Sequence, residues 1–293
     1  MTCKLHVWVS VGLPISLLKS VLLSFSSTYL LIAGCALSPA SDFDNYATHL
    51  GLDSNSVHSA SHDHRVFSKS GDSSSGLRVY FGSDGTPWVG NKTVARDPTP
   101  QRPLTLDLMT RDPGPAVYVG RPCYHGKMRN CGPHLWTSGR FSESVLASMT
   151  EATRTIIAGY PGLEVTLIGY SGGGVLALLV AERLPGVARV VTLAANLDTD
   201  NWADRHGYLP LSSSINPADH LSWRQELIQL HLSGTRDENV TADDHERLRR
   251  KHHAATFKQV ADFSHSCCWV EHWPRLLEEA LATQLLTTDS TQQ

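Results

Sequence analysis

Apolar residues recur along this chain with two different spacings. Six short segments are apolar at every second position or throughout, which is typical of β-strands. They are LRVYF (77–81), PAVYV (115–119), LEVTLIGY (163–170), ARVVTLAANLD (188–198), LIQLHLSG (227–234) and TFKQVADF (256–263). Four other segments are predicted to be helices, three of them because apolar residues recur three and four positions apart and the one at 243–253 as a charged helix. They are 142–158, 175–184, 243–253 and 273–286. Strands separated by helices predict an α/β fold, a mostly parallel, doubly wound sheet with helices on both faces.

This alternation runs from residue 76 to residue 287 without a break, so we expect one domain there and a short disordered tail at 288–293. Residues 35–75 precede the domain and are rich in Ser, Asp and His but poor in large apolar side chains. We expect this segment to be a polar tether or an irregular hairpin. Three of its histidines could alternatively bind a metal ion, namely His58, His62 and His64.

Composition and charge exclude some classes of function. The chain has 293 residues, of which 41% are hydrophobic and 18% are charged, which suits one large globular domain. Its formal net charge is −3, and the sequence contains no basic stripe. Both features argue against nucleic acid as the main partner. We expect the protein to be a monomer.

The N-terminal residues have the pattern of an export signal. Lys4 and Lys19 precede an apolar run at 21–33 that is too short for a comfortable transmembrane helix. The run ends in LIAGC (31–35), which resembles the lipobox of bacterial lipoproteins; the alternative is a simple secretory signal with an incidental cysteine. The resemblance implies cleavage after residue 34 and acylation of Cys35. Because Ala36 rather than Asp follows, it also implies an outer-membrane anchor facing the periplasm or the cell surface.

Cysteine positions predict disulfides. Removing residues 1–34 leaves Cys35 and four other cysteines, and an even remainder in an exported chain favours bridges. Cys123 and Cys131 flank a turn-like segment, so we expect a local bridge between them. Cys267 and Cys268 are adjacent, and their pairing is left open.

A single serine lies between a predicted strand and a predicted helix. It is Ser171 in the sequence GYSGG, which has the form G-x-S-x-G. A sharp strand-to-helix turn needs small neighbours, and it exposes the central side chain at the helix N-terminus, where developing negative charge is favoured. We therefore interpret Ser171 as a nucleophile. The alternative is a tight glycine turn without chemistry.

A serine nucleophile needs a base and an acid that orients the base. Functional residues of a doubly wound sheet lie beyond the carboxyl ends of its strands. Asp237 and His265 follow the last two predicted strands, and the order Ser171, Asp237, His265 is that of an α/β-hydrolase triad. The alternative acids, Asp198 and Asp200, follow an earlier strand, and His272 is the alternative base.

Backbone N–H groups must stabilise the oxyanion that forms during acyl attack. We expect one from Gly172 and another from Ser83 or Asp84, in the loop after the strand at 77–81. The alternative for that loop is an ordinary hairpin turn. Trp202 and Tyr208 lie in a Trp-, Pro- and Ser-rich stretch that we expect to line the acyl pocket. That stretch could instead be a surface loop packed by its own aromatic residues.

Together these motifs resemble the bacterial α/β-hydrolase superfamily, and more narrowly its small exported or lipoprotein members. The resemblance covers residue 77 to the C-terminal helix and rests on GYSGG, SGTRDENV, DFSHSCCW and VYFGSDGTPW. The last motif departs from the more common His-Gly type of oxyanion loop. The resemblance implies hydrolysis of a small ester or related acyl substrate through an acyl-enzyme, without a metal or organic cofactor. A serine peptidase, a thioesterase and a non-catalytic binding lipoprotein are the alternatives.

Overall fold

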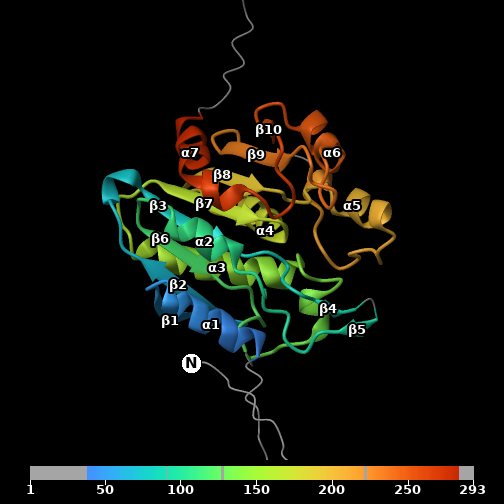
Figure 1. Cartoon of the computed structure of the whole chain (residues 1–293), viewed down its shortest axis with the longest axis horizontal. Helices are drawn as coiled ribbons and strands as arrows, with labels where there is room; N and C mark the ends of the chain where they lie inside the picture. Colours follow the sequence, from blue (N-terminus) through green and yellow to red (C-terminus); the bar gives the residue numbers. More distant parts are fainter. Residues whose placement is uncertain (1–37, 91, 127–128, 221–222, 284–293) are drawn as a thin grey trace, which may run out of the picture. The chain divides into compact units, whose positions relative to one another are not determined.

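The computed structural model describes residues 38–283 with the exception of 91, 127–128 and 221–222 (Figure 1). The predicted signal peptide at 1–34, the expected lipidation site Cys35 and the tail at 288–293 lie outside the described residues. Within the described ranges, no helix combines the length and the apolar character that crossing a membrane requires.

Eight strands form one mixed sheet, and six of them are parallel to one another, as the sequence predicts. In sheet order the strands are β1 (Asp53–His58), β2 (Asp63–Lys69), β6 (Ala116–Val119), β3 (Leu77–Phe81), β7 (Val165–Tyr170), β8 (Val187–Leu193), β9 (Ile228–Gly234) and β10 (Thr256–Val260). The other two, β1 and β2, are antiparallel to each other, and β2 is also antiparallel to β6, the first strand of the parallel part. A separate short ribbon pairs β4 (Trp88–Val89) with β5 (Thr93–Val94).

Helices cover both faces of the sheet (Figure 1). Side chains of α1 (Pro39–His49), α2 (Leu104–Thr110) and α7 (Trp269–Ala282) share one apolar cluster, which includes Tyr80 of β3. Side chains of α3 (Glu143–Ala158) and α4 (Gly172–Glu182) share another, which includes Val79 and Phe81 of the same strand. Since alternate residues of a strand point to opposite faces, the two clusters lie on opposite sides of the sheet. The remaining helices are α5 (Thr199–His206), α6 (Asp243–Lys251) and the 3-10 turns Ser73–Ser75, Pro133–Trp136 and Pro217–Asp219.

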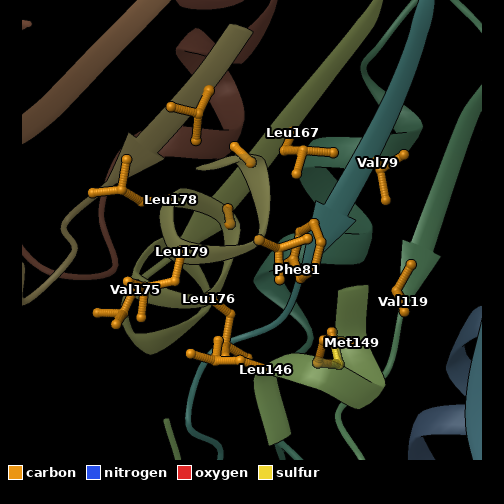
Figure 2. Packing of buried hydrophobic residues seen from close by; sticks show 14 of the residues in the cluster. Val79, Phe81, Val119, Leu146, Met149, Leu167, Val175, Leu176, Leu178 and Leu179 are labelled. Atoms are coloured by element: carbon orange, nitrogen blue, oxygen red, sulfur yellow. The ribbon is translucent and has the colours of Figure 1, made fainter. Parts of the chain in front are cut away.

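Helix α4 is buried on every side, which explains why its sequence is apolar throughout. Figure 2 shows Val175 and Leu176 of α4 among side chains of the sheet and of α3, including Leu146 and Met149. Each buried residue of this size contributes about 1.5–3 kcal/mol relative to an exposed one. The packing therefore fixes the N-terminus of α4 against the sheet, and it is this end of the helix that follows Ser171.

The prediction of a tether for residues 35–75 is wrong for the described part of that segment, whereas the alternative, a hairpin, is present as the antiparallel pair β1–β2. α1 begins where the Ser38 hydroxyl accepts a hydrogen bond from the Ser41 N–H, and it buries Phe43 against the sheet. β2 pairs with β6 and buries Phe67 completely. Backbone pairing and a few apolar anchors are enough to hold this segment, so its low hydrophobicity does not make it a tether.

The three histidines of this segment bond to different groups. His58 contacts Asp63, and His62 contacts Ser61. Buried His64 lies 2.9 Å from the Gly120 carbonyl oxygen through Nδ1 and 2.7 Å from Ser148 Oγ through Nε2. Among the described residues, no group of three or more His, Cys, Asp or Glu side chains is arranged to hold a metal ion.

Candidate active site

Ser171 occupies a strained turn between β7 and α4. Its backbone angles are φ 55° and ψ −130°, a region that costs a non-glycine residue energy and is retained where the surrounding structure enforces it. Two hydrogen bonds enforce it here: the Ser171 N–H donates to the Leu193 carbonyl over 2.8 Å, and the Gly174 N–H donates to the Ser171 carbonyl over 2.8 Å. The turn presents the serine side chain at the N-terminus of α4.

The glycines around Ser171 are required by close backbone contacts. A Cβ atom on Gly169 would lie 2.2 Å from the carbonyl oxygen of Gly173, and one on Gly173 would lie 2.2 Å from that of Phe81. Both distances are far below a van der Waals contact, and backbone atoms cannot move aside as a flexible side chain can. The G-x-S-x-G pattern therefore reflects the close approach of three segments of chain around the serine.

The structure brings Ser171, His265 and Asp237 together from three separate segments. His265 follows β10, and its Nε2 lies 3.2 Å from Ser171 Oγ. Asp237 follows β9, and its Oδ2 lies 2.9 Å from His265 Nδ1. The Asp237 side chain is fully buried, whereas that of His265 is 26% exposed. The imidazole therefore bridges a buried carboxylate and a serine at the edge of the site.

Asp237 is held in position by the backbone of its own loop. Its Oδ1 accepts hydrogen bonds from the N–H groups of Asn239, at 2.9 Å, and Val240, at 2.8 Å. These bonds fix the carboxylate and leave Oδ2 for His265. On the histidine side, the Trp269 indole donates to the backbone carbonyl of His265 over 3.1 Å. Both partners are thus oriented before any substrate binds.

The alternative acid and base lie in other networks. Asp198 caps α5, and its Oδ1 accepts a hydrogen bond from Asn216 Nδ2 over 2.9 Å. Asp200 also accepts a hydrogen bond from Asn216, over 3.0 Å. His272 lies 3.1 Å from the Cys268 carbonyl through Nδ1. Asp198, Asp200 and His272 therefore each contact groups other than Ser171 and His265.

The loop that was expected to supply an oxyanion donor lies beside the serine turn. Asp84 of this loop forms ion pairs of 2.8 Å with both Arg121 and Arg140. Arg121 also donates to the carbonyl oxygen of Gly172 over 3.0 Å. One guanidinium group therefore ties the loop to the residue directly after the serine. Among the described residues, the N–H groups of Ser83, Asp84 and Gly172 donate to no backbone carbonyl.

Two arginines that the sequence analysis did not identify control the charge at this loop. Burial alone would raise the pKa of Asp84, but the positive charges of Arg121 and Arg140 outweigh it and hold the pKa below its usual value. Asp84 is therefore ionised, and the two guanidinium groups neutralise it. The Tyr124 hydroxyl adds a hydrogen bond of 2.9 Å to the Asp84 carbonyl oxygen.

The first part of the stretch that we expect to line the pocket forms helix α5 (Thr199–His206). Asp198 caps the start of this helix, and Gly207 ends it in the left-handed conformation. The aromatic rings of the stretch pack on one another, as the alternative predicts: the Tyr208 ring lies 5.2 Å from Trp202 and 5.0 Å from His206 between centroids. Trp202 packs with Ala203 and Val240 in a small apolar cluster, and Tyr208 is 52% exposed. Helix α5 is not predicted from the sequence, because only eight residues form it and the residues that cap it, Asp198 and Gly207, are also typical of loops.

One polar contact to the site was not indicated by the sequence. The Asn239 amide nitrogen lies 3.0 Å from His265 Nε2, the same atom that faces Ser171. Asn239 lies two residues beyond Asp237, and nothing in the pattern of the loop distinguishes it from its neighbours. Only the folded loop brings its side chain to the histidine.

The described cysteines form two disulfides. Cys123 is bonded to Cys131, the pair that the local spacing favours. Cys267 is bonded to Cys268, which settles the pairing that the sequence left open. The second bridge lies between His265 and the start of α7.

Comparison with solved structures identifies the architecture. No family model matches the sequence, and no curated protein is significantly similar to it. An esterase from Pyrococcus furiosus superposes with a TM-score of 0.58 at 13% identity, over 80% of this chain and 92% of the other. A proline iminopeptidase-related protein from Thermus thermophilus gives 0.54 at 13% identity, over 79% and 97% of the two chains. An esterase/lipase from an uncultured bacterium gives 0.52 at 14% identity, over 86% and 94%. This chain has the α/β-hydrolase fold.

Proposed function

We propose that this protein is a serine hydrolase that cleaves carboxylic ester or related acyl bonds. The observation that carries the proposal is the chain of contacts Ser171–His265–Asp237 at the strained turn, with distances of 3.2 Å and 2.9 Å. A serine, a base within reach of its hydroxyl and an acid that orients the base are the parts that acyl transfer requires. The esterase names of two structural neighbours support the choice of esters as the substrate class.

In the first half of the reaction, Ser171 Oγ attacks the substrate carbonyl carbon while His265 Nε2 takes the hydroxyl proton. The buried carboxylate of Asp237 stabilises the imidazolium that forms and holds the ring so that Nε2 faces the serine. His265 then gives the proton to the departing alcohol, which leaves an ester on Ser171. In the second half, His265 Nε2 takes a proton from water while the water oxygen attacks this ester. His265 then returns the proton to Ser171 Oγ as the bond to the serine breaks and the acid is released.

Both tetrahedral intermediates carry a negative oxygen that needs donors. The N–H of Gly172 at the start of α4 is the first, with the positive end of the helix dipole behind it. The loop N–H groups at Ser83 and Asp84 are the candidates for the second. Because Asp84 is paired with Arg121 and Arg140, its side chain adds no unbalanced negative charge near the oxyanion.

The proposal is tested with the full chain, a fluorophosphonate probe and a series of p-nitrophenyl esters of increasing acyl length. The wild-type protein should be labelled at Ser171 and should hydrolyse at least one ester. Ser171→Ala should not be labelled, and its turnover should fall by about three orders of magnitude or more. A folded Ser171→Ala protein that keeps wild-type turnover would exclude this function.

We also propose that Cys35 is acylated and anchors the protein to a membrane. The LIAGC motif supports this, and α1 begins at Pro39, only four residues later in the sequence. We therefore propose an anchor without the long tether that the sequence predicts, because the folded domain begins at α1. Cys35→Ser should move the protein out of the membrane fraction without lowering esterase turnover; retention in that fraction after a high-salt wash would contradict the anchor.

A further inference from the structure

Two hydrogen-bond donors approach the same nitrogen of His265. Ser171 Oγ lies 3.2 Å from Nε2, and Asn239 Nδ2 lies 3.0 Å from it. A neutral imidazole nitrogen has one lone pair, and that lone pair lies in the plane of the ring. The amide of Asn239 therefore shares the proton-accepting position that the proposed nucleophile needs.

The neighbours of Asn239 determine which way its amide faces. The Trp202 indole nitrogen, which can only donate, lies 3.4 Å from Asn239 Oδ1. The oxygen must accept from Trp202, so the NH₂ group faces His265. The backbone carbonyl oxygen of Asn239 accepts a hydrogen bond from Arg205 over 2.7 Å and lies 2.8 Å from His206 Nε2. Helix α5 thus holds both the backbone and the side chain of Asn239 in place.

The protonation of His265 follows from its two contacts. Nδ1 faces the Asp237 carboxylate, which can only accept, so Nδ1 carries a proton. Nε2 is then the lone-pair nitrogen of a neutral ring, and the Asn239 N–H can donate to it. If Nε2 were also protonated, its N–H and the Asn239 N–H would point at each other with only 3.0 Å between the two nitrogens. The contact stabilises the neutral ring and opposes the imidazolium.

We propose that Asn239 is a positioning residue that keeps His265 in its neutral, proton-accepting form by donating a hydrogen bond to Nε2. This inference rests on the proposed function, since it concerns the base of that reaction. During turnover the amide must give way when Nε2 takes the serine proton. Asn239 therefore makes His265 a weaker base, and this extends activity toward lower pH.

Other groups near His265 also influence its charge. Asp237 contacts Nδ1, and the Tyr170 ring lies 5.4 Å from the imidazole between centroids. Burial, and after it the charge of Asp237, raise the pKa of Tyr170, so its hydroxyl is neutral; the charge of Arg102 acts in the opposite direction. Arg205 and His206 reach Asn239 from α5. A substitution confined to the Asn239 side chain keeps all of these groups, so a change in pH dependence reports on the amide.

The test is the pH profile of kcat/KM for p-nitrophenyl ester hydrolysis by the full-length wild type, Asn239→Ala and Asn239→Asp. Loss of the amide in Asn239→Ala should move the midpoint of the acid limb upward by about 0.5–1 pH unit, the size expected for one hydrogen bond. Asn239→Asp keeps the shape and an acceptor for Trp202 but places a carboxylate beside Nε2, so its midpoint should move further. The control is Asn201→Ala on α5, whose amide bonds to Asp244 over 2.9 Å; its midpoint should stay at the wild-type value.

The outcomes separate this inference from the proposed function. Upward shifts in the order wild type, Asn239→Ala, Asn239→Asp support the inference. A loss of activity by the same factor at every pH, with an unchanged midpoint in Asn239→Ala, indicates a purely structural role and overturns the inference, whatever the midpoint of Asn239→Asp. If Asn239→Ala does not fold, Asn239→Leu, which keeps the approximate size but has no donor and no charge, takes its place and should show the same upward shift. If the wild type neither hydrolyses esters nor reacts with the fluorophosphonate probe, the proposed function fails and the inference fails with it.

Discussion

The carboxylate of Asp84 lies directly against the backbone of Gly172: a Cβ atom on Gly172 would fall 2.0 Å from Asp84 Oδ1. The carboxylate cannot easily retreat, because Arg121 and Arg140 both hold it at 2.8 Å. The loop at 82–85 and the serine turn thus fit together through a contact that only glycine permits. This fit sets the spacing between the two proposed oxyanion donors.

We therefore predict that Gly172→Ala impairs catalysis more than folding. The added methyl group must displace Asp84 and with it the loop that carries the second donor. Loss of one oxyanion donor lowers kcat by about 10²–10³-fold in serine hydrolases, and we expect a loss of that order. Ester turnover and a thermal unfolding curve measure the two effects.

Gly186→Ala is the matched control for this prediction. Gly186 follows α4, and a Cβ atom there would meet nothing within 4 Å. This variant should keep wild-type turnover. If Gly172→Ala is as active as Gly186→Ala, the contact with Asp84 does not set the geometry of the oxyanion site.

The sequence predicts the features that depend on neighbouring residues. The strand, turn and helix around Ser171 follow from a local change of apolar spacing, and β3 has the predicted bounds Leu77–Phe81. Asp237 and His265 could be proposed because parallel strands bring their carboxyl ends to one edge of the sheet. The structure places them at the serine.

Contacts between residues far apart in the sequence are not predicted from it. Arg121 reaches Gly172 across 51 positions of sequence, and Arg140 reaches Asp84 across 56. No local pattern marks either arginine, and a basic residue is most often exposed. For α1 and β2 the prediction fails for another reason, because a polar composition does not by itself exclude folded structure. Pairing with β6 supplies the backbone hydrogen bonds of β2 whatever its composition.

A comparison of two aspartates tests the identity of the acid. Asp237→Asn should lower kcat by about 10⁴-fold, because an amide at this position no longer fixes the histidine tautomer or stabilises the imidazolium. Asp198→Asn should leave turnover nearly unchanged. Its stability should also change little, because Asn and Asp are nearly equivalent as helix N-caps and an amide oxygen can still accept from the Asn201 N–H at the start of α5.

Steady-state kinetics and chemical denaturation on both variants measure this contrast. The Asp237→Asn protein should remain folded, because an amide oxygen can still accept from the Asn239 and Val240 N–H groups. The opposite ranking, with Asp198→Asn the less active enzyme, would transfer the acid role to the loop after β8.

Buried His64 predicts how stability depends on pH. Burial lowers the pKa of His64 to about 4, and the hydrogen bond to the Gly120 carbonyl only partly opposes this effect. The ring is neutral in the folded protein at pH 7, whereas in the unfolded chain it takes up a proton near pH 6.5. The unfolded state therefore binds more protons between these two values, and stability falls as the pH falls through that window.

We expect His64 to lower the free energy of unfolding by roughly 3 kcal/mol between pH 7 and pH 4, with no further loss from this group below its folded-state pKa. Urea denaturation at a series of pH values measures the slope. His64→Gln removes one titrating group and should make the curve shallower in this window. Buried His125, His231 and His245, whose pKa values burial also lowers, still contribute. The control is His253→Gln at an exposed position, which should reproduce the wild-type slope. If His64→Gln and wild type lose stability in parallel from pH 6.5 to pH 4, the acid sensitivity of the fold comes from other groups, of which buried His125 is the next to test because burial lowers its pKa to about 3.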